Sequence, residues 1–593
     1  MVHQAEPKAA HSVSRRGFLA GSAGAAALAG LSWAPAGAVP RGSASTIAPP
    51  PGFPSDIPLS QQAYANWSRE IMLDSVWTAT PRHSDDVVTL ANWAFDNGYT
   101  VRARGTMHGW SPLTVVPGAP SDCVLLVDTM TNLNSVVVQH GTPATDIAGA
   151  GTPAMVTAGA GASIEAILTA LEREGLGWAN SPAIGELSIA GALAIGAHGA
   201  TYPAAGETIT PGQSYGSLSN LITEITVVAW DEGSNRYALK TFHRSDDEIT
   251  AFLTHLGRTF VTSVTLQAGE NYRLRCQSFT DIPWQELFAA PGSPGRTYES
   301  FVEKSGRVEA IWFPFTETPW LKIWTPTPVK PPESREVSGP YNYFFSDAIP
   351  EEVTTPLGMV AQGLQAATTL FGASQFGAVA AGLALTDTDD LWGWSKNVLF
   401  YLRHTTLRVV AGGGAVITKR SNIGRVVHEM TSWLNERMTH YASLGQYPVN
   451  MPFEVRLCGV DDNGEVLVDS AGVPDLSAVR PRADRQDWDA AIWMNVVSIP
   501  GTAGLPAFLR EMERWMVANY SGDYATFRPE WSKGWAFTDQ AAYQDDEFLT
   551  STVPATFRAG GDGNWDFALA TLDEHDPHRV FSNTFLDRVL PPS

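Results

Sequence analysis

The chain has 593 residues, with 39 Lys or Arg against 61 Asp or Glu, and its formal net charge is −22. Nucleic-acid binding depends on contacts from Lys and Arg to phosphates, so this balance argues against a nucleic-acid partner. The length predicts two or more domains. Cys123, Cys276 and Cys458 allow one disulfide at most, and their wide spacing matches no metal site.

The first 38 residues have the pattern of an export signal. Arg15 and Arg16 precede an Ala/Gly/Leu-rich run from Ala20 to Leu31, and small residues at 36–38 offer a cleavage site. This combination is typical of a twin-arginine signal, so we expect residues 1–38 to be removed and the mature protein to be secreted. A disordered basic N-terminus is the alternative. We find no later run of ~20 uninterrupted apolar residues, the length that a membrane span needs.

A histidine in a glycine-punctuated loop follows the first clear strand pattern. Residues 99–103 alternate like a strand and lead into Arg104-Gly105-Thr106-Met107-His108-Gly109. A tight loop whose backbone N–H groups turn inward can hold a pyrophosphate. The histidine would then contact the cofactor or be bonded to it. Alternatively, His108 is an ordinary hydrogen-bonded loop residue beside an arginine.

Strand and helix patterns alternate in the residues that follow. Residues 124–128, 155–159 and 222–230 have strand patterns, and Ser163 is placed to cap a helix over 164–175. This alternation predicts an α/β arrangement for the first domain.

A second region of small residues runs from Gly185 to Gly199. It contains Ser188, Gly191, Gly196 and His198. Small residues let a backbone approach a diphosphate closely. One such loop is weak evidence, but this region, the turn at Gly159 and the histidine loop occur together, and the combination is much more specific.

Beyond about residue 276 the chain is rich in aromatic strands. Strands are expected at 307–315, 453–458 and 490–498, with helices at 352–383 and 423–441 between them. The 20 tryptophans and 25 phenylalanines could line a large apolar cavity, although most will be core. The tail at 573–586 has the pattern of a return to the first domain.

Period-two alternation places polar side chains on the faces of these strands. Glu309 and Asn495 lie among apolar neighbours, and Glu454 shares a face with Arg456. If the strands form one sheet, these groups converge, and a dry cavity would raise the pKa of a carboxylate there. The alternative for Glu454 and Arg456 is a surface ion pair worth ~0–1 kcal/mol. Lys533 is a cationic candidate among aromatic residues, or else an exposed loop lysine.

The loop around His108, the turn at Gly159, the segment 185–199 and the Phe-Ser-Asn tail around Asn583 together resemble the vanillyl-alcohol oxidase family of FAD flavoproteins. The strands around Glu309 and Glu454 are similar to those of its covalent-FAD (type II) cholesterol oxidases. The resemblance implies an α+β, two-domain FAD-binding (PCMH-like) fold. Residues 39–275 would bind FAD, and 276–545 would form a substrate domain on a large antiparallel sheet flanked by helices. Residues 546–593 would return to the FAD domain.

The resemblance also implies a chemistry. FAD would be bonded through its 8α-methyl group to His108, and a 3β-hydroxysteroid would be oxidised with O2 as acceptor, giving H2O2 and, after isomerisation, the Δ4-3-ketosteroid. Glu454 and Arg456 match a pair proposed to gate oxygen, while Glu309, Asn495 and Lys533 match polar groups around flavin and substrate. The implied cofactor-binding residues are Arg104, Gly105, Thr106, Met107, His108, Gly109, Gly159, Gly185, Ser188, Gly191, Gly196, His198, Gly199 and Asn583. Gly109 departs from the family, which commonly has Ser there.

Two other functions remain open from the sequence. The same scaffold could oxidise a sugar, an aldonolactone or an aromatic alcohol, although polar substrates need more hydrogen-bonding side chains than this central region offers. An exported flavin-carrying or sterol-binding protein without turnover is the other alternative. Expected partners are a sterol and O2, with a transient membrane-surface contact to extract the sterol, no metal, and a monomeric state.

Overall fold

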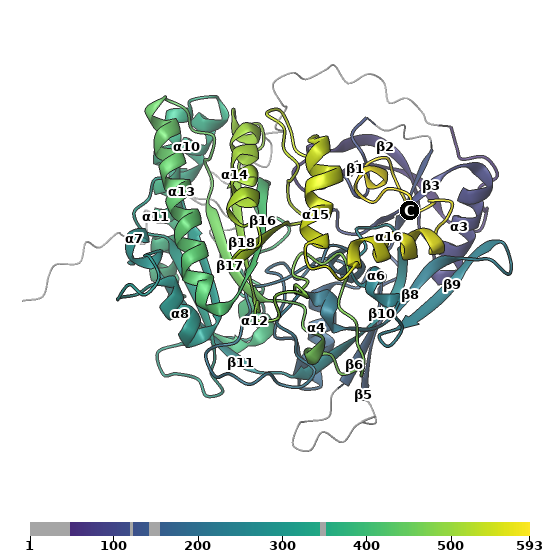
Figure 1. The fold of residues 1–593 in the computed structure, drawn as a ribbon, viewed down its shortest axis with the longest axis horizontal. Helices are drawn as coiled ribbons and strands as arrows, with labels where there is room; N and C mark the ends of the chain where they lie inside the picture. The colour runs from purple at the N-terminus through teal and green to yellow at the C-terminus, as the bar shows by residue number, and fades with distance from the viewer. Residues whose placement is uncertain (1–47, 119–122, 141–153, 344–350) are drawn as a thin grey trace, which may run out of the picture.

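The computed structural model describes residues 48–118, 123–140, 154–343 and 351–593. The export signal expected at residues 1–38 lies outside the described residues. The described chain forms two lobes side by side (Figure 1). An N-terminal lobe holds the purple and teal strands, and a central lobe holds the green strands and helices.

The first sheet of the N-terminal lobe positions the histidine loop. Its order is β1-β2-β4-β3, with β3 and β4 parallel. The strands are β1 (Leu59–Ala65), β2 (Met72–Ala79), β3 (Thr100–Arg104) and β4 (Val124–Asp128). Helix α3 (Ser84–Asn97) connects β2 to β3 and ends at Gly98, whose φ of 70° is left-handed. The loop that carries His108 leaves the C-terminal end of β3.

The second sheet has the order β5-β6-β10-β8-β9, and β7 also pairs with β10. Its strands are β5 (Val136–His140), β6 (Ala154–Gly159), β7 (Leu176–Gly177), β8 (Ile222–Asp231), β9 (Arg236–His243) and β10 (Phe260–Glu270). The helices of this part are α4 (Ile164–Arg173), α5 (Ile189–Ala194), η2 (Leu218–Leu221) and α6 (Ile249–Leu253). As the sequence predicts, Ser163 caps α4, because its hydroxyl accepts the N–H of Ala166 at 3.1 Å.

The central lobe is built on one nine-stranded sheet of order β14-β15-β11-β13-β12-β17-β18-β16-β19. Only the β14–β15 pair at one edge is parallel, so the expected large antiparallel sheet is confirmed. The strands are β11 (Arg273–Phe279), β12 (Arg307–Trp312), β13 (Trp320–Pro326), β14 (Arg335–Val337), β15 (Asp390–Trp394), β16 (Val410–Thr418), β17 (Phe453–Gly459), β18 (Ala490–Ser498) and β19 (Ala525–Pro529).

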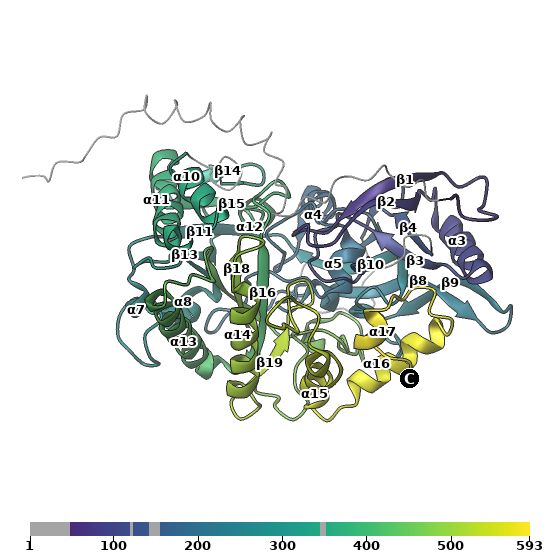
Figure 2. The same cartoon turned by 90° about the horizontal axis from the view of Figure 1, so that it is seen from above.

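Helices cover this sheet on the side away from the N-terminal lobe (Figures 1 and 2). They include α8 (Tyr298–Ser305), α13 (Ile423–Ser443) and α14 (Leu505–Asn519), while α7 (Trp284–Leu287), α12 (Ser395–Leu399), η4 (Arg420–Asn422) and η5 (Asn463–Glu465) are short connections. The long helix α13 closely matches the predicted helix at 423–441.

The helix predicted over 352–383 is interrupted. The structure has α10 (Glu351–Ala361), a turn at η3 (Gln365–Ala367) and then α11 (Thr368–Thr386). Gly363 breaks the helix, because its φ of 91° lies outside any helical region. The segment Gln365–Thr386 is also long and apolar enough to cross a bilayer by length and composition alone, although residues such as Thr369 and Gln375 interrupt its apolar run.

The last part of the chain returns to the N-terminal lobe. Helix α15 (Val553–Arg558), which follows η6 (Phe548–Thr552), still packs on β19 of the central lobe. Figure 2 shows the yellow helices α16 (Asn564–His575) and α17 (Leu586–Val589) beside the teal strands. Asp576 pairs with the buried guanidinium of Arg258 at 2.5 Å. Arg102 donates to the carbonyl of Phe581. The amide of Asn583 donates to the carbonyls of residues 112 and 113 at 3.1 Å each.

Candidate active site

A cavity of about 320 Å³ lies where the two lobes meet. The N-terminal lobe contributes the backbone of the histidine loop, the small-residue segment from Ser188 to Ala200, and residues around His255. The central lobe contributes a set of mostly polar side chains, namely Glu309, Trp324, Tyr401, Arg456, Glu530 and Lys533. One wall is therefore backbone and small residues, and the facing wall carries charges.

A second cavity of about 260 Å³ adjoins the first. Both are lined by His108, Tyr401, Arg456 and Lys533. The rest of the second lining is mainly apolar: Ile311, Phe313 and Trp320 from the sheet, Val353 and Leu357 from α10, and Phe371, Ala378 and Val379 from α11. The charged groups thus stand at the junction between a polar cavity and an apolar one.

His108 sits between two tryptophans at this junction. Its ring lies 3.9 Å from the ring of Trp67 and 5.9 Å from that of Trp110, centroid to centroid. The loop turns sharply just before it, because Met107 has a left-handed φ of 56°. Burial, reinforced by Lys533 and Arg408, lowers the pKa of His108 to about 3, so the imidazole is neutral at physiological pH.

The histidine loop is tied to the loop that carries Lys533. The N–H of Trp110 donates to the carbonyl of Ser532 at 2.9 Å, and the hydroxyl of Ser111 donates to the carbonyl of Lys533 at 3.1 Å. The Lys533 ammonium lies 4.1 Å from the centroid of the Trp110 ring. Lys533 is therefore a component of the cavity and not an exposed loop lysine, and burial lowers its pKa.

Glu309 lies between two cations on neighbouring strands. In the sheet register it faces Lys322 of β13 on one side and Arg456 of β17 on the other. Its carboxylate is 2.6 Å from the Lys322 ammonium and 2.6 Å from Nε of Arg456, and it accepts the Tyr401 hydroxyl at 2.7 Å.

The charge environment reverses one expectation for Glu309. Burial by itself raises the pKa of this carboxyl, as the sequence predicts for a dry cavity. Lys322 and Arg456 outweigh that effect and lower the pKa to about 2. The predicted raised pKa is therefore wrong for Glu309, which is a fixed anion.

Arg456 is shared between two carboxylates. Besides Glu309, it pairs with Glu454 through Nη2 at 2.9 Å, and the side chains of Glu454 and Arg456 are only 17% and 15% exposed. The surface ion pair considered as an alternative is therefore not what the fold contains. The two carboxylates raise the pKa of Arg456 against the effect of burial, so it stays charged.

A second acid, Glu530, anchors the other side of the cavity. It accepts the amide of Asn495 at 2.8 Å and lies 3.7 Å from Nε2 of His198, whose ring stacks on Trp493 at 3.7 Å. Burial raises the pKa of Glu530, but Lys533 and His198 outweigh it and bring the pKa to about 2. Asn495 thus lies behind Glu530 and lines neither cavity.

Sequence reasoning missed Glu530, Lys322, Tyr401 and Trp67. Glu530 lies three residues before Lys533, and an acid between aromatic residues was the signal available for it. The other three are recognised only once strand register and loop packing place them beside Glu309 or His108.

Most of the predicted cofactor-binding residues line the first cavity: Arg104, Gly105, Thr106, Met107, His108, Gly109, Ser188, Gly191, Gly196, His198 and Gly199. Three others do not. Gly159 packs against the backbone of Leu133, Gly185 packs against Phe400, and the amide of Asn583 holds the chain after the histidine loop. These three residues therefore lie outside the cavity lining and pack against other segments of the chain.

The first cavity suits a dinucleotide cofactor such as FAD. Arg102 lines it, is buried, and has no hydrogen-bond partner for its Nε within the described part of the chain. His255 also lines it, and its Nε2 is likewise unpartnered there. Buried donors of this kind are normally satisfied, and phosphate or nucleotide oxygens would satisfy them.

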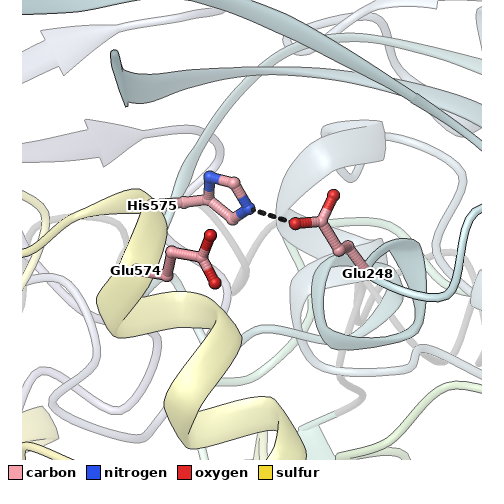
Figure 3. A group of neighbouring side chains, drawn as sticks. All are labelled: Glu248, Glu574 and His575. Atoms are coloured by element: carbon pink, nitrogen blue, oxygen red, sulfur yellow. Dashed lines mark hydrogen bonds and ion pairs between the residues drawn. The ribbon is translucent and has the colours of Figure 1, made fainter. Parts of the chain in front are cut away.

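A third cluster of titratable residues lies outside both cavities. Glu248, Glu574 and His575 place potential ligand atoms within 4.8 Å of one another (Figure 3). Glu248 already contacts Nε2 of His575 at 3.1 Å and the ammonium of Lys240 at 3.6 Å. Because these partners satisfy its charge, we assign no metal to this group.

Comparison with known proteins agrees with this geometry. Residues 77–234 match the family model of the FAD binding domain, and residues 273–591 match that of the cholesterol oxidase substrate-binding domain. No curated protein sequence matched. The fold and the cavity define a two-lobed flavoprotein that binds FAD.

Solved structures narrow the class further. Two structures of the cholesterol oxidase from Brevibacterium sterolicum, one of them a histidine-to-alanine mutant, are each 53% identical, with a TM-score of 0.89, over 92% of this chain and 100% of theirs. A solvent-stable cholesterol oxidase is 48% identical, with a TM-score of 0.88, over 91% of this chain and 100% of its own. The chain belongs to the cholesterol oxidase family.

Gly199 and Gly109 both line the first cavity and allow a matched test of whether that cavity binds FAD. A Cβ at Gly199 would overlap the carbonyl oxygen of Ser181, whereas a Cβ at Gly109 would meet nothing within 4 Å. We expect Gly199→Ala to cost about 1–3 kcal/mol of stability and to lower the flavin bound per protein, since the backbone must shift. Gly109→Ala should keep both. Thermal unfolding and flavin absorbance after gel filtration measure this, and equal flavin content in both variants would contradict it.

Proposed function

We propose that this protein is an FAD-dependent oxidase of 3β-hydroxysteroids, with cholesterol as a substrate and O2 as the electron acceptor. The observation that supports this most strongly is the junction of the two cavities. An apolar cavity opens onto the FAD cavity at the point where His108, Arg456 and Lys533 gather. A fused-ring alcohol would place its rings on the apolar side and its hydroxyl at the charged junction.

The apolar lining favours a sterol over a sugar. Apart from Gln375, Thr406 and Glu454, the second cavity has its polar side chains at the junction, so a sugar would find few partners for its hydroxyls. Each buried CH2 of a sterol contributes roughly 0.8 kcal/mol. Hydrophobic contact would therefore stabilise the bound sterol, and the polar groups would only orient its hydroxyl.

The roles of the residues follow from their charges. When bound, FAD would accept the hydride from the carbon that carries the substrate hydroxyl, and the hydroxyl proton would pass to a basic group at the junction. Lys533 supplies a positive charge at the junction that would stabilise negative charge developing there. Glu309 is a poor proton acceptor, because Lys322 and Arg456 hold its pKa at about 2. Glu454 lines the apolar cavity and is the carboxylate that we assign to moving the proton from C4 to C6 in the isomerisation.

Anaerobic mixing with substrate tests the oxidase proposal. We expect cholesterol, but not glucose, to bleach the flavin spectrum, and admission of air to restore it with release of H2O2. The accumulating product should show the absorbance of a conjugated enone if the isomerisation also occurs. A flavin that cholesterol leaves unbleached would refute the oxidase, and bleaching by glucose alone would favour the sugar-oxidase alternative.

We also propose that His108 carries the FAD through a covalent 8α-histidyl bond. A neutral imidazole is the nucleophilic form, and the lowered pKa of His108 keeps it so. The ring lies in the cavity wall between Trp67 and Trp110, which fixes its orientation. Gly109 lacks the hydroxyl of the serine that is common at this position in the family, but the rings of Trp67 and Trp110 still contact His108.

Denaturation in acid tests the attachment. We expect the flavin of the wild type to precipitate with the protein and to add its mass to the peptide containing His108. His108→Ala should release all flavin on denaturation. His198→Ala is the matched control, because His198 lines the same cavity and should leave the bond intact. Release of flavin from the wild type would disprove the covalent bond.

We further infer that a lipid bilayer is the surface from which the sterol enters, and that the outer face of α11 contacts it. The segment Gln365–Thr386 contains no charged residue, although the protein carries a net charge of −22. Leu364, Leu370 and Leu385 are 56%, 54% and 53% exposed. The inner face of the same helix lines the apolar cavity, so the cavity wall and the exposed apolar face are one element.

Cholesterol-containing phosphatidylcholine vesicles test this contact. Leu370→Glu should weaken vesicle binding and vesicle turnover roughly tenfold or more, since burial of a leucine side chain is worth about 1.5–3 kcal/mol. Turnover of detergent-dispersed cholesterol should not change. Leu239→Glu, at an exposed leucine on β9, is the control. Equal vesicle binding by both variants, or a dimer that Leu370→Glu dissociates, would show that lipid is not the occupant.

A further inference from the structure

Lys322 is fully buried and lines neither cavity. Burial lowers its pKa, and the neighbouring Glu309 carboxylate opposes that shift. Its ammonium lies 2.6 Å from Glu309 and is enclosed by aromatic rings, with the centroids of Tyr401, Trp320 and Trp324 at 3.0, 4.8 and 5.1 Å. Water and substrate therefore do not reach it. Any effect of Lys322 on the reaction is therefore indirect, through Glu309 or through the rings of Tyr401 and Trp324, which line the first cavity.

The sheet aligns four charges in one connected cluster. Lys322, Glu309 and Arg456 face one another across β13, β12 and β17, and Glu454 lies two residues from Arg456 on the same face. Two carboxylates and two cations give a net charge of zero. Arg456 bridges both carboxylates, whereas Lys322 contacts only Glu309.

The presence of Lys322 determines whether the Arg456 side chain can move away from Glu309. A buried carboxylate that loses its only counter-ion is strongly destabilised. If Arg456 were the sole partner of Glu309, it could not turn toward Glu454 or the cavity without leaving an unpaired charge. Because Lys322 stays in place, Glu309 remains paired whatever Arg456 does.

We propose that Lys322 is a positioning residue that serves as the permanent counter-ion of Glu309 and so leaves Arg456 free to exchange between Glu309 and Glu454. The proposal rests on the oxidase function proposed above. It assigns a role to a residue that touches neither substrate nor cofactor.

The other groups around Glu309 do not compete for this role. Burial raises the pKa of Tyr401 and Tyr298 above their usual value and that of Cys276 to about 12, so all three stay neutral near physiological pH. Glu454 reaches Glu309 only through Arg456. Lys322 and Arg456 are thus the two cations that hold Glu309 ionised.

The pH dependence of oxidation tests the proposal on the flavin-loaded enzyme. With Lys322 present, Glu309 stays ionised at every pH well above about 2, the value to which its pKa is lowered. Protonation of Glu309 therefore causes no fall in kcat/KM on the acid side of the pH profile (no acid limb) in that range. In Lys322→Met, loss of one cation should raise the pKa of Glu309, and an acid limb in kcat/KM should move upward by about one to three pH units. Lys322→Arg, which keeps the charge, should restore the wild-type profile.

The double variant Lys322→Met/Glu309→Gln separates this role from a purely structural one. It has no ionisable group at 309, so the new acid limb should vanish, and it should unfold at a higher temperature than Lys322→Met alone. If Lys322→Met fails to fold while the double variant folds, the counter-ion role is also supported.

A Lys322→Met profile that superimposes on the wild type, or an acid limb that persists in the double variant, would overturn the proposal. The unfolding comparison needs no turnover. A wild type inactive on cholesterol would therefore refute the proposed function while the pairing of Lys322 with Glu309 could still be tested.

Discussion

Cancellation of buried charge between neighbouring strands is the constraint on which the site depends. Glu309, Lys322, Arg456 and Glu454 form a neutral cluster on three neighbouring strands, and Glu530 is balanced by Lys533 on the other side. Burial of an unpaired ion would strongly destabilise the folded state. The antiparallel register of the sheet satisfies this constraint, because it brings opposite charges face to face.

Hydrogen bonds between two loops help to join the lobes beside the site. In the loop after His108, the N–H of Trp110 and the hydroxyl of Ser111 donate to the carbonyls of Ser532 and Lys533. His108, from the first sheet, and Lys533, from the central lobe, are therefore fixed relative to one another. This arrangement keeps the cofactor wall and the substrate wall in one rigid frame, so the cavity needs no large closure to bring its groups together.

The local periodicity of the sequence predicted several strands of the central sheet and the faces that carry their polar residues. Strands β17 and β18 fall where alternation predicts them, and they carry Glu454, Arg456 and Asn495 on the expected faces. The pKa of Glu309 could not be predicted, because its controlling partner Lys322 is set by register with β13. The break between α10 and α11 was also missed, since an apolar run reads as continuous helix until Gly363 adopts a positive φ.

The return of the C-terminus has a consequence for how the chain matures. Asp576, Phe581 and Asn583 hold Arg258, Arg102 and the residues after the histidine loop, across more than 300 positions of sequence. A ribosome delivers these partners last, after the whole central lobe. The N-terminal lobe therefore cannot complete these contacts until the central lobe has been synthesised. A short C-terminal truncation would act as a defect in maturation, even though the deleted residues lie far along the chain from the histidine loop.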